Sequence, residues 1–192
     1  MTHTDSMLCS QTRLRRAVHV LASGGVVACP TEAVWGLSCD PFDDEAVMEI
    51  LALKVRPADK GLILAAGNEK QLAFLLDGLP GDIRKKLSLS WPGPNTWLVP
   101  HHNRVPALVH GRFDSVAVRV SGHPLMRKLC EEFGGPLVST SANLAGKTAP
   151  RTRLAVQLAF GDALDDILPG RVGDSTQPST IRDAFTDTVI RP

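Results

Sequence analysis

The segment "SVAVRVSGHPLMRKLCEEFGGPLVST", residues 115–140, decides the fold class because it reads as strand, helix and strand in succession. In its first six residues the alternation places Ser115, Ala117 and Arg119 on one strand face and the valines on the other. Residues 124–133 have the apolar spacing of a helix, and residues 136–140 are typical of a second strand. An arginine in a strand otherwise suited to a core needs an anionic partner, either a ligand or a structural carboxylate.

Strands and helices interleave in the same way on both sides of this segment. We expect helices over residues 12–23, 43–57, 69–76, 81–89 and 151–160, strands over 26–30, 61–66 and 96–100, and two strands joined by a turn in 178–192. Asp43 or Asp44, Asn68 and Thr152 are expected as N-caps, and Pro57 ends the second helix. The pattern predicts one α/β domain over residues 1–192, with an open, twisted, mixed sheet flanked by helices and a flexible tail at 1–10.

Composition narrows the classes of function. The 192 residues are 43% hydrophobic and 21% charged, and the net charge of +1 excludes a uniformly basic nucleic-acid coat but not a local basic patch. The chain has no run of about 18 apolar residues and no signal-peptide core, so we expect a cytoplasmic protein without a membrane partner. The pair His101-His102 is expected in a surface loop without a metal. Four cysteines lack metal-site spacing and are expected as free thiols: Cys9, Cys29, Cys39 and Cys130.

Two short polar segments follow predicted elements. Thr31 and Glu32 come directly after the first predicted strand, where either a plain turn or part of a site is expected. Lys54 continues the apolar stripe of the second predicted helix rather than its solvent face. With Arg56 and Lys60 it forms a group of three cations that either receives a polyanion such as a triphosphate or complements the helix dipole.

A third polar segment, "VSTSANLAGKTAP", spans residues 138–150 and contains Gly146-Lys147-Thr148, the end of a P-loop motif. A P-loop also needs a glycine where this chain has Ser141, and Pro150 stands where its helix should run, so we exclude a P-loop kinase. The hydroxyl and amide side chains of this segment suit phosphate, ribose or carboxylate groups, and turn capping is the alternative.

Six motifs occur along the chain in a fixed order: "PTEAVWGL", "LKVRPADKGLIL", "WPGPNTWLV", "FDSVAVRVSGHPL", "PLVSTSANLAG" and "PSTIRD". Over about residues 12–191 the chain thereby resembles the YrdC-like threonylcarbamoyl-AMP synthases in their short, single-domain bacterial form. The resemblance implies an open twisted α/β sheet around a deep basic cavity. It also implies that L-threonine, bicarbonate and ATP, with Mg²⁺, give threonylcarbamoyl-adenylate and pyrophosphate, and that partner proteins transfer the threonylcarbamoyl group to tRNA.

The resemblance further implies binding residues. Eight positions match family contacts to ATP: Lys54, Arg56, Lys60, Ser115, Ser141, Asn143, Ala149 and Arg191. Four positions match contacts to threonine: Thr31, Arg119, Ser139 and Ser179. We assign no catalytic side chain, because a carbamate formed from threonine and bicarbonate can attack the α-phosphate of ATP without a covalent enzyme intermediate. The segment "STSANLAGKT" would then bind phosphate and adenylate, with Lys147 as a solvated side chain.

The chain departs from the family pattern at three places. Lys60-Gly61 replaces the Asn-Pro of longer members, and Trp35 replaces a Tyr or Phe. Ala65 stands where longer members carry a His that assists threonine binding. The last departure concerns how threonine is recognised rather than the class of reaction.

The alternative function is an RNA-binding module without catalysis. A cavity lined by Lys54, Arg56 and Lys60 would then bind double-stranded RNA by its shape and phosphates. The hydroxyl and amide side chains of Thr31 and of residues 139–143 favour the amino-acid pocket, because phosphate binding alone does not require them.

Overall fold

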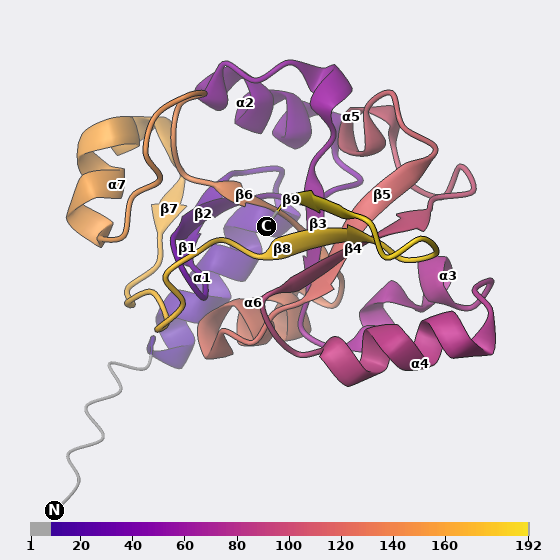
Figure 1. The fold of residues 1–192 in the computed structure, drawn as a ribbon. Coiled ribbons are helices and arrows are strands. Elements are labelled where there is room, and N and C mark those ends of the chain that lie inside the picture. Colours follow the sequence, from indigo (N-terminus) through magenta and orange to yellow (C-terminus); the bar gives the residue numbers. More distant parts are fainter. Residues whose placement is uncertain (1–8, 192) are drawn as a thin grey trace, which may run out of the picture.

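The computed structural model describes residues 9–191, which form a mixed nine-stranded sheet with helices on its two faces (Figure 1). In spatial order the strands run β7-β1-β2-β6-β3-β5-β4-β8-β9. The pairs β1–β7, β3–β5 and β4–β8 are parallel and the other pairs are antiparallel, which confirms the predicted open, mixed sheet. The strands are β1 Val27–Pro30, β2 Trp35–Ser38, β3 Ile63–Ala66, β4 Asn95–Pro100, β5 Ser115–Val120, β6 Leu137–Ser141, β7 Asp166–Ile167, β8 Thr180–Asp183 and β9 Val189–Arg191.

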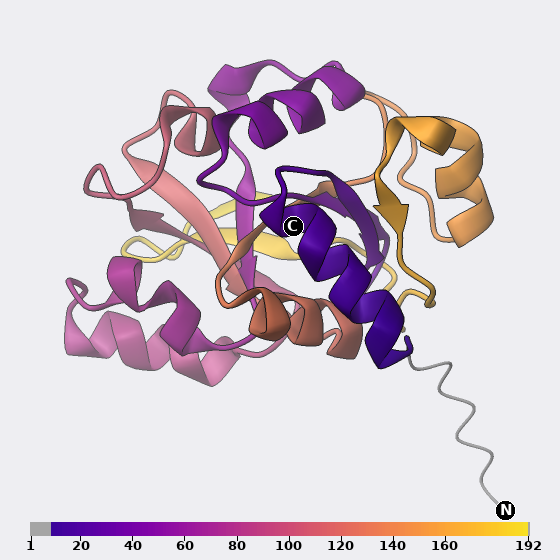
Figure 2. The ribbon, with the colours of Figure 1, turned by 180° about the vertical axis from the view of Figure 1, so that it is seen from behind.

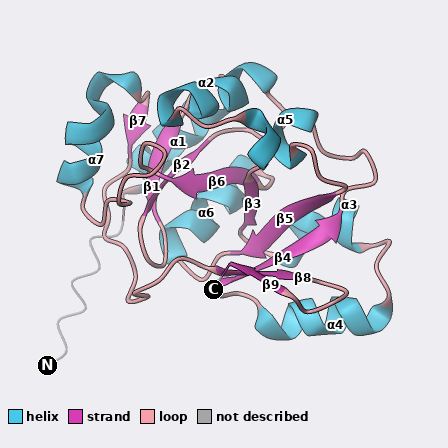
Figure 3. Ribbon diagram, turned by 45° about the horizontal axis from the view of Figure 1, so that its top comes forward, coloured by secondary structure: helices cyan, strands magenta, loops and turns pink. Residues whose placement is uncertain are grey.

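The helices lie around the outside of the sheet, as Figure 3 shows. The α-helices are α1 Gln11–Ala22, α2 Asp44–Lys54, α3 Ala73–Leu76, α4 Gly81–Ser90, α5 Ala107–His110, α6 Pro124–Phe133 and α7 Arg153–Phe160. Three short 3₁₀ turns are η1 Ala58–Lys60, η2 Glu69–Leu72 and η3 Gly161–Ala163. Among the described residues no helix is long and apolar enough to span a bilayer.

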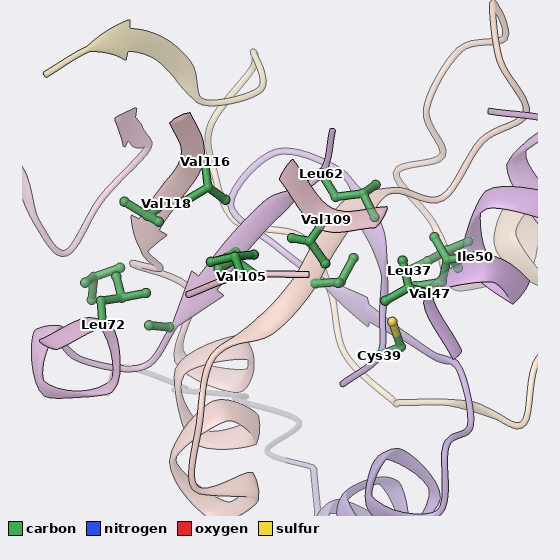
Figure 4. Close-up of a cluster of buried hydrophobic side chains, with 14 of the residues drawn as sticks. Leu37, Cys39, Val47, Ile50, Leu62, Leu72, Val105, Val109, Val116 and Val118 are labelled. Carbon is green, nitrogen blue, oxygen red and sulfur yellow. The ribbon is translucent and has the colours of Figure 1, made fainter. Parts of the chain in front are cut away.

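One face of the sheet supports the larger hydrophobic core. Leu64, Val116, Val118 and Val138 point to this face and pack with buried residues of α2, α3, α4, α5 and α7. Figure 4 shows part of this cluster, from Leu72 and Val118 on one side to Val47 and Ile50 of α2 on the other. The valines predicted on one face of residues 115–120 therefore do lie in the core.

The opposite face is covered only in part by helices. Helices α1 and α6 lie next to each other in front of the sheet in Figure 2, which shows the molecule from behind. Their residues Leu14 and Met126 belong to one buried cluster with Ala65 and Leu137 of the central strands. Strands β3, β5 and β6 extend beyond this helical cover, and the residues there line a pocket instead. The fold thus leaves one part of a central sheet face open for a site.

Several predicted element ends are confirmed by their caps. The Asp43 carboxylate accepts the N–H groups of Glu45 and Ala46 at the start of α2, and the Thr152 hydroxyl accepts the N–H of Ala155 at the start of α7. Ser10 caps α1, so it is ordered, and residues 1–8 of the predicted tail lie outside the described residues. Helix α2 already ends at Lys54, because Val55 takes a left-handed conformation before Pro57 is reached.

Of the sequence-based expectations about local structure, one was wrong and one was wrong in part. Asn68 makes no side-chain capping bond, and residues 69–76 form a 3₁₀ turn followed by one short helix instead of one continuous helix. The pair His101-His102 does lie in a loop after β4, with His102 exposed, but His101 is buried and its ring stacks on His110 with the ring centroids 3.9 Å apart. Strands β2 and β7 and the short helix α5 were not predicted at all.

Candidate functional site

A pocket of about 370 Å³ opens on the uncovered part of the sheet, where β8 and β9 form a further wall. Its lining contains five cationic side chains and one carboxylate: Arg56, Lys60, Arg119, Lys147, Arg191 and Glu32. Eleven of the twelve binding residues expected from the sequence line this pocket: Thr31, Arg56, Lys60, Ser115, Arg119, Ser139, Ser141, Asn143, Ala149, Ser179 and Arg191. The expected residues therefore converge on one pocket from distant parts of the chain.

Lys54 is the one expected residue outside the lining, and it lies beneath the loop that follows β6. Its Nζ donates to the carbonyl oxygens of Ser141 and Asn143, the latter at 2.7 Å, and its own carbonyl accepts the N–H of Ala145 at 3.0 Å. Burial, with a smaller contribution from the charge of Arg56, lowers the pKa of Lys54 to about 8. Lys54 thus ties helix α2 to the Ser-x-Asn loop, and the prediction that it leaves the solvent face of α2 is confirmed.

The Ser-x-Asn loop is held in place by further backbone contacts. The Asn143 side-chain amide donates to the carbonyls of Leu144 and Lys147, at 2.9 and 2.6 Å. On its other side the loop is fixed to β2, because the N–H of Ala142 donates to the carbonyl of Trp35 and the N–H of Trp35 donates to the carbonyl of Pro150. The aromatic residue at position 35 is fully buried, so Trp35 supports the loop from the core.

The segment after α2 brings Arg56 and Lys60 to the pocket. The Arg56 Nη2 donates to the carbonyl of Gly61 at 2.8 Å, which fixes the guanidinium against the turn η1. Gly61 has φ of 61°, and a Cβ there would meet the carbonyl oxygen of His110 at 3.0 Å, so glycine suits this close approach of η1 to α5. Burial lowers the pKa of Arg56, and the nearby Asp59 carboxylate opposes that shift.

Arg191 closes the cationic wall from the C-terminal strand β9. Its Nη2 donates to the Ser179 carbonyl at 2.9 Å, and the Ser179 hydroxyl in turn lies 2.8 Å from that of Thr96. Burial and then the charges of Arg119 and Arg56 lower the pKa of Arg191. Because the charges of Arg119 and Arg56 act on Arg191, the three guanidinium groups together favour an anionic ligand.

A second group of polar side chains surrounds Arg119 on β5. The Arg119 Nη2 donates to the Ser139 hydroxyl at 3.2 Å, and Nη1 lies 3.3 Å from the Glu32 carboxylate. Thr31 precedes Glu32 in a tight turn, where its hydroxyl donates to the Val34 carbonyl at 2.8 Å. Of the two partners considered for Arg119 from the sequence, the structure shows the structural carboxylate, which is Glu32 in the same pocket lining.

Ala65, the position of the family histidine, pairs with Arg119 across β3 and β5. Its side chain packs in the core beneath α6 and does not line the pocket. The sequence also missed Glu32 as a partner of Arg119, and it missed His110 and Phe113, which line the pocket from α5 and the turn after it.

The described residues do not offer a side-chain site for a metal. No group of three His, Cys, Asp or Glu side chains gathers in residues 9–191, and the one carboxylate in the pocket lining, Glu32, is already paired with Arg119. Magnesium sites commonly use one or two carboxylates together with substrate phosphates. The residues present therefore do not fit a Mg²⁺ ion held by the protein.

The described thiols and hydroxyls are poorly placed as nucleophiles. All four cysteines are free, and burial raises the pKa of each, to about 12 for Cys130. Within residues 9–191, no serine or threonine hydroxyl in the pocket lining hydrogen-bonds to a histidine. The arrangement suits binding and charge neutralisation better than covalent catalysis.

Comparisons with known proteins agree with this arrangement. The family Sua5_yciO_yrdC, described as "Telomere recombination", matches residues 19–192. A threonylcarbamoyl-AMP synthase from Pseudomonas aeruginosa strain UCBPP-PA14 is 56% identical over 183 residues, which cover 95% of this chain and 98% of that protein. A protein of the same name from Saccharophagus degradans is 51% identical over 179 residues, which cover 93% of this chain and 94% of its own.

Solved structures share the fold. The structure of P. abyssi Sua5 complexed with L-threonine superposes with a TM-score of 0.89 at 32% identity, covering 95% of this chain and 54% of that one. E. coli YciO superposes with a TM-score of 0.84 at 23% identity, covering 95% of this chain and 89% of that one, which supports the fold alone. From the family match and the identity to curated relatives, this chain belongs to the Sua5/YciO/YrdC family.

Proposed function

We propose that this protein is a threonylcarbamoyl-AMP synthase, which converts L-threonine, bicarbonate and ATP to threonylcarbamoyl-adenylate and pyrophosphate for tRNA modification. Relatives of that name are 50–56% identical over almost the whole chain. The observation on this chain that carries the proposal is the convergence of cations and small polar side chains on one pocket. Its volume of about 370 Å³ is in the range typical of small-molecule sites.

ATP would bind on the side of the pocket where cations gather and no carboxylate belongs to the lining. Arg56, Lys60 and Arg191 would neutralise the triphosphate. The Ser141 and Asn143 loop, held by Lys54, would position the phosphates or the adenylate. Ser115 and Ala149 complete this set in the lining. Lys54 acts here by shaping the loop, since its ammonium group is already bonded to two carbonyls of that loop.

Threonine would bind on the side of Arg119, where the guanidinium can receive its carboxylate. The hydroxyls of Thr31, Ser139 and Ser179 lie around this position in the lining. The threonine amine attacks bicarbonate and gives a carbamate with loss of water, and a carbamate oxygen then attacks the α-phosphorus of ATP as pyrophosphate leaves. Catalysis comes from placing the two substrates together and from neutralising the charge of the leaving pyrophosphate.

Any Mg²⁺ would enter with the phosphates of ATP, since the pocket offers no free carboxylate to hold it. The product would pass to separate proteins that transfer the threonylcarbamoyl group to tRNA. A cytoplasmic location fits substrates of this kind.

The test is incubation with ATP, bicarbonate and threonine, followed by measurement of pyrophosphate and of the adenylate by mass spectrometry. We expect pyrophosphate only when threonine and bicarbonate are both present. In Arg56→Ala we expect at least about a hundredfold loss of pyrophosphate formation with an unchanged fold, because a guanidinium that faces the triphosphate is removed. Near-normal activity in that variant would remove Arg56 from the site.

RNA binding without catalysis gives a different result. It predicts that RNA, and not ATP with threonine, raises the melting temperature of the protein. Stabilisation by RNA alone, together with no pyrophosphate formation, would replace the enzymatic proposal.

A further inference from the structure

We propose that Glu32 is a positioning residue for Arg119, which it fixes so that the guanidinium presents one defined edge to the carboxylate of threonine. The inference rests on the proposed function and adds a residue that the expected binding set did not contain. Glu32 acts through Arg119 and does not touch the substrate. Three features of the structure carry this role: the anchoring of Glu32, the edge of Arg119 whose direction it fixes, and the burial of both charges.

Glu32 is anchored from two directions. One carboxylate oxygen, Oε1, accepts the Ser121 hydroxyl at 2.9 Å and the Gly122 N–H at 2.7 Å, and both residues follow directly on the strand that carries Arg119. Its backbone carbonyl accepts the N–H of Ser175 at 3.1 Å. The carboxylate therefore cannot swing away when a ligand arrives, and its position relative to β5 is set by the fold.

The second carboxylate oxygen determines how Arg119 is oriented. Oε2 of Glu32 lies 3.3 Å from Nη1 of Arg119, while Nη2 donates to the Ser139 hydroxyl. Nε of Arg119 is fully buried, so a ligand reaches the guanidinium only at the edge formed by Nη1 and Nη2. These two nitrogens carry two parallel N–H bonds, and such an edge matches a carboxylate. Glu32 and Ser139 fix the direction of this edge, because each holds one of the two nitrogens.

Arg119 and Glu32 each need a charged partner, because both side chains are buried. The side chains of Arg119 and Glu32 are only 8% and 12% exposed, and a buried charge without a partner is costly. Burial alone would raise the pKa of Glu32, but the charge of Arg119 and the hydrogen bonds to the carboxylate outweigh it and lower that pKa. Since Oε2 is fully buried and Oε1 is bonded to Ser121 and Gly122, the ionised carboxylate of Glu32 influences threonine through Arg119.

Glu32→Gln tests the role, because it keeps the shape of the side chain and removes its charge. Threonine is compared with threoninamide, which keeps the reacting amine but lacks the carboxylate. At saturating ATP we expect the KM for threonine to rise by roughly tenfold to a hundredfold. The kcat, the KM for ATP and the kinetics with threoninamide should change by less than about threefold, because those contacts do not involve the carboxylate.

The Arg119→Lys background provides the matched control. Lysine cannot present two parallel N–H bonds, so threonine should lose its advantage over threoninamide in this variant. Adding Glu32→Gln to Arg119→Lys should then have little further effect on the KM for threonine, since the two residues act on the same contact. An effect of Glu32→Gln that is as large in this background as in the wild type would overturn the proposal.

Ser121→Ala is a second route to the same answer, because it removes one anchor of the carboxylate and keeps the charge. We expect a smaller rise in the threonine KM, about twofold to fivefold. Threonine-induced shifts in melting temperature give a readout without turnover. Equal losses with threonine and threoninamide, or no loss with either, would contradict the positioning role. A wild-type protein that neither forms pyrophosphate with threonine nor is stabilised by it contradicts the proposed function itself.

Discussion

The fold stabilises two buried cations in different ways: Arg119 in the pocket lining and Lys54 beneath the loop that follows β6. Lys54 donates to two backbone carbonyl oxygens, and none of the ion pairs among residues 9–191 involves it. Arg119 is paired with a carboxylate and a hydroxyl. Carbonyl dipoles leave the full positive charge uncompensated, whereas a carboxylate cancels the charge and fixes the direction of the guanidinium.

This difference suits two kinds of ligand. A triphosphate carries several negative charges, so a region with uncompensated cations near Lys54, Arg56 and Arg191 favours it. A single carboxylate on a small amino acid needs geometry more than charge, which the pair of Arg119 and Glu32 provides. The comparison predicts that the two regions respond differently to substitution, to pH and to each substrate.

Arg119→Ala should produce the largest loss of stability. The substitution leaves Glu32 buried without its cation, which typically costs about 3 kcal/mol of unfolding free energy. The KM for threonine should rise strongly while the KM for ATP changes little, because the ATP side keeps its own cations. Urea unfolding and steady-state kinetics measure both effects. An unchanged threonine KM would refute the carboxylate-binding role of Arg119.

Lys54→Met should have the next largest effect on stability and should act on the other substrate. Methionine fills the space of the stem but leaves the Ser141 and Asn143 carbonyls without their donor, at a cost of about 2 kcal/mol. Because the loop loses its support, we expect kcat/KM for ATP to fall by roughly a hundredfold, with a smaller change for threonine. A greater effect on threonine than on ATP would break the division of the pocket into two regions.

The pH dependence of the unfolding free energy tests how burial affects Lys54. Burial lowers its pKa from 10.5 to about 8, so between those values the unfolded chain holds more protons than the folded protein. The contribution of Lys54 to the unfolding free energy should therefore rise with pH across that window, since deprotonation relieves the cost of a buried charge. The difference in unfolding free energy between wild type and Lys54→Met, measured from pH 8 to 10.5, isolates this contribution. A difference that falls with pH would show that the bonds to the two carbonyls outweigh burial.

The sequence predicted local structure well where a clear alternation or a capping residue was present. The alternation in residues 115–120 and the caps Asp43 and Thr152 gave the right faces and helix starts. Asn68 has the right residue type for a cap, but the chain around it turns through a 3₁₀ segment, so the side chain finds no helix N–H to accept. Strand β7 has only two residues, too few for a periodic signal, and is specified by tertiary pairing. Strand β2 is as long as the predicted strand β1 and was missed because it follows directly on the polar turn at Thr31 and Glu32.

The binding residues of the site were predictable for a different reason. The convergence of eleven expected residues came from motifs matched to a family, not from periodicity. Glu32 was visible as a polar residue after a strand, but its pairing with Arg119 joins positions 87 residues apart, and no local pattern reports such a contact. In the same way Lys54 was placed correctly off the solvent face of α2, whereas its two carbonyl partners depend on the path of a loop far along the chain.

Lys147 should show the smallest effect, and it tests whether position in the pocket or charge alone matters. It lines the same pocket and belongs to the segment that resembles a P-loop, but its side chain is exposed and forms none of the ion pairs found among residues 9–191. The Asn143 amide is bonded to its backbone carbonyl, which alanine retains. We therefore expect Lys147→Ala to change the unfolding free energy by less than about 0.5 kcal/mol and the KM for ATP by less than about twofold. Lys60→Ala, at the turn η1, serves as the matched control and should raise the KM for ATP. If Lys147→Ala instead matches Lys60→Ala, the triphosphate extends to the loop end, and the uncompensated cationic region is larger than the group around Arg56 and Arg191.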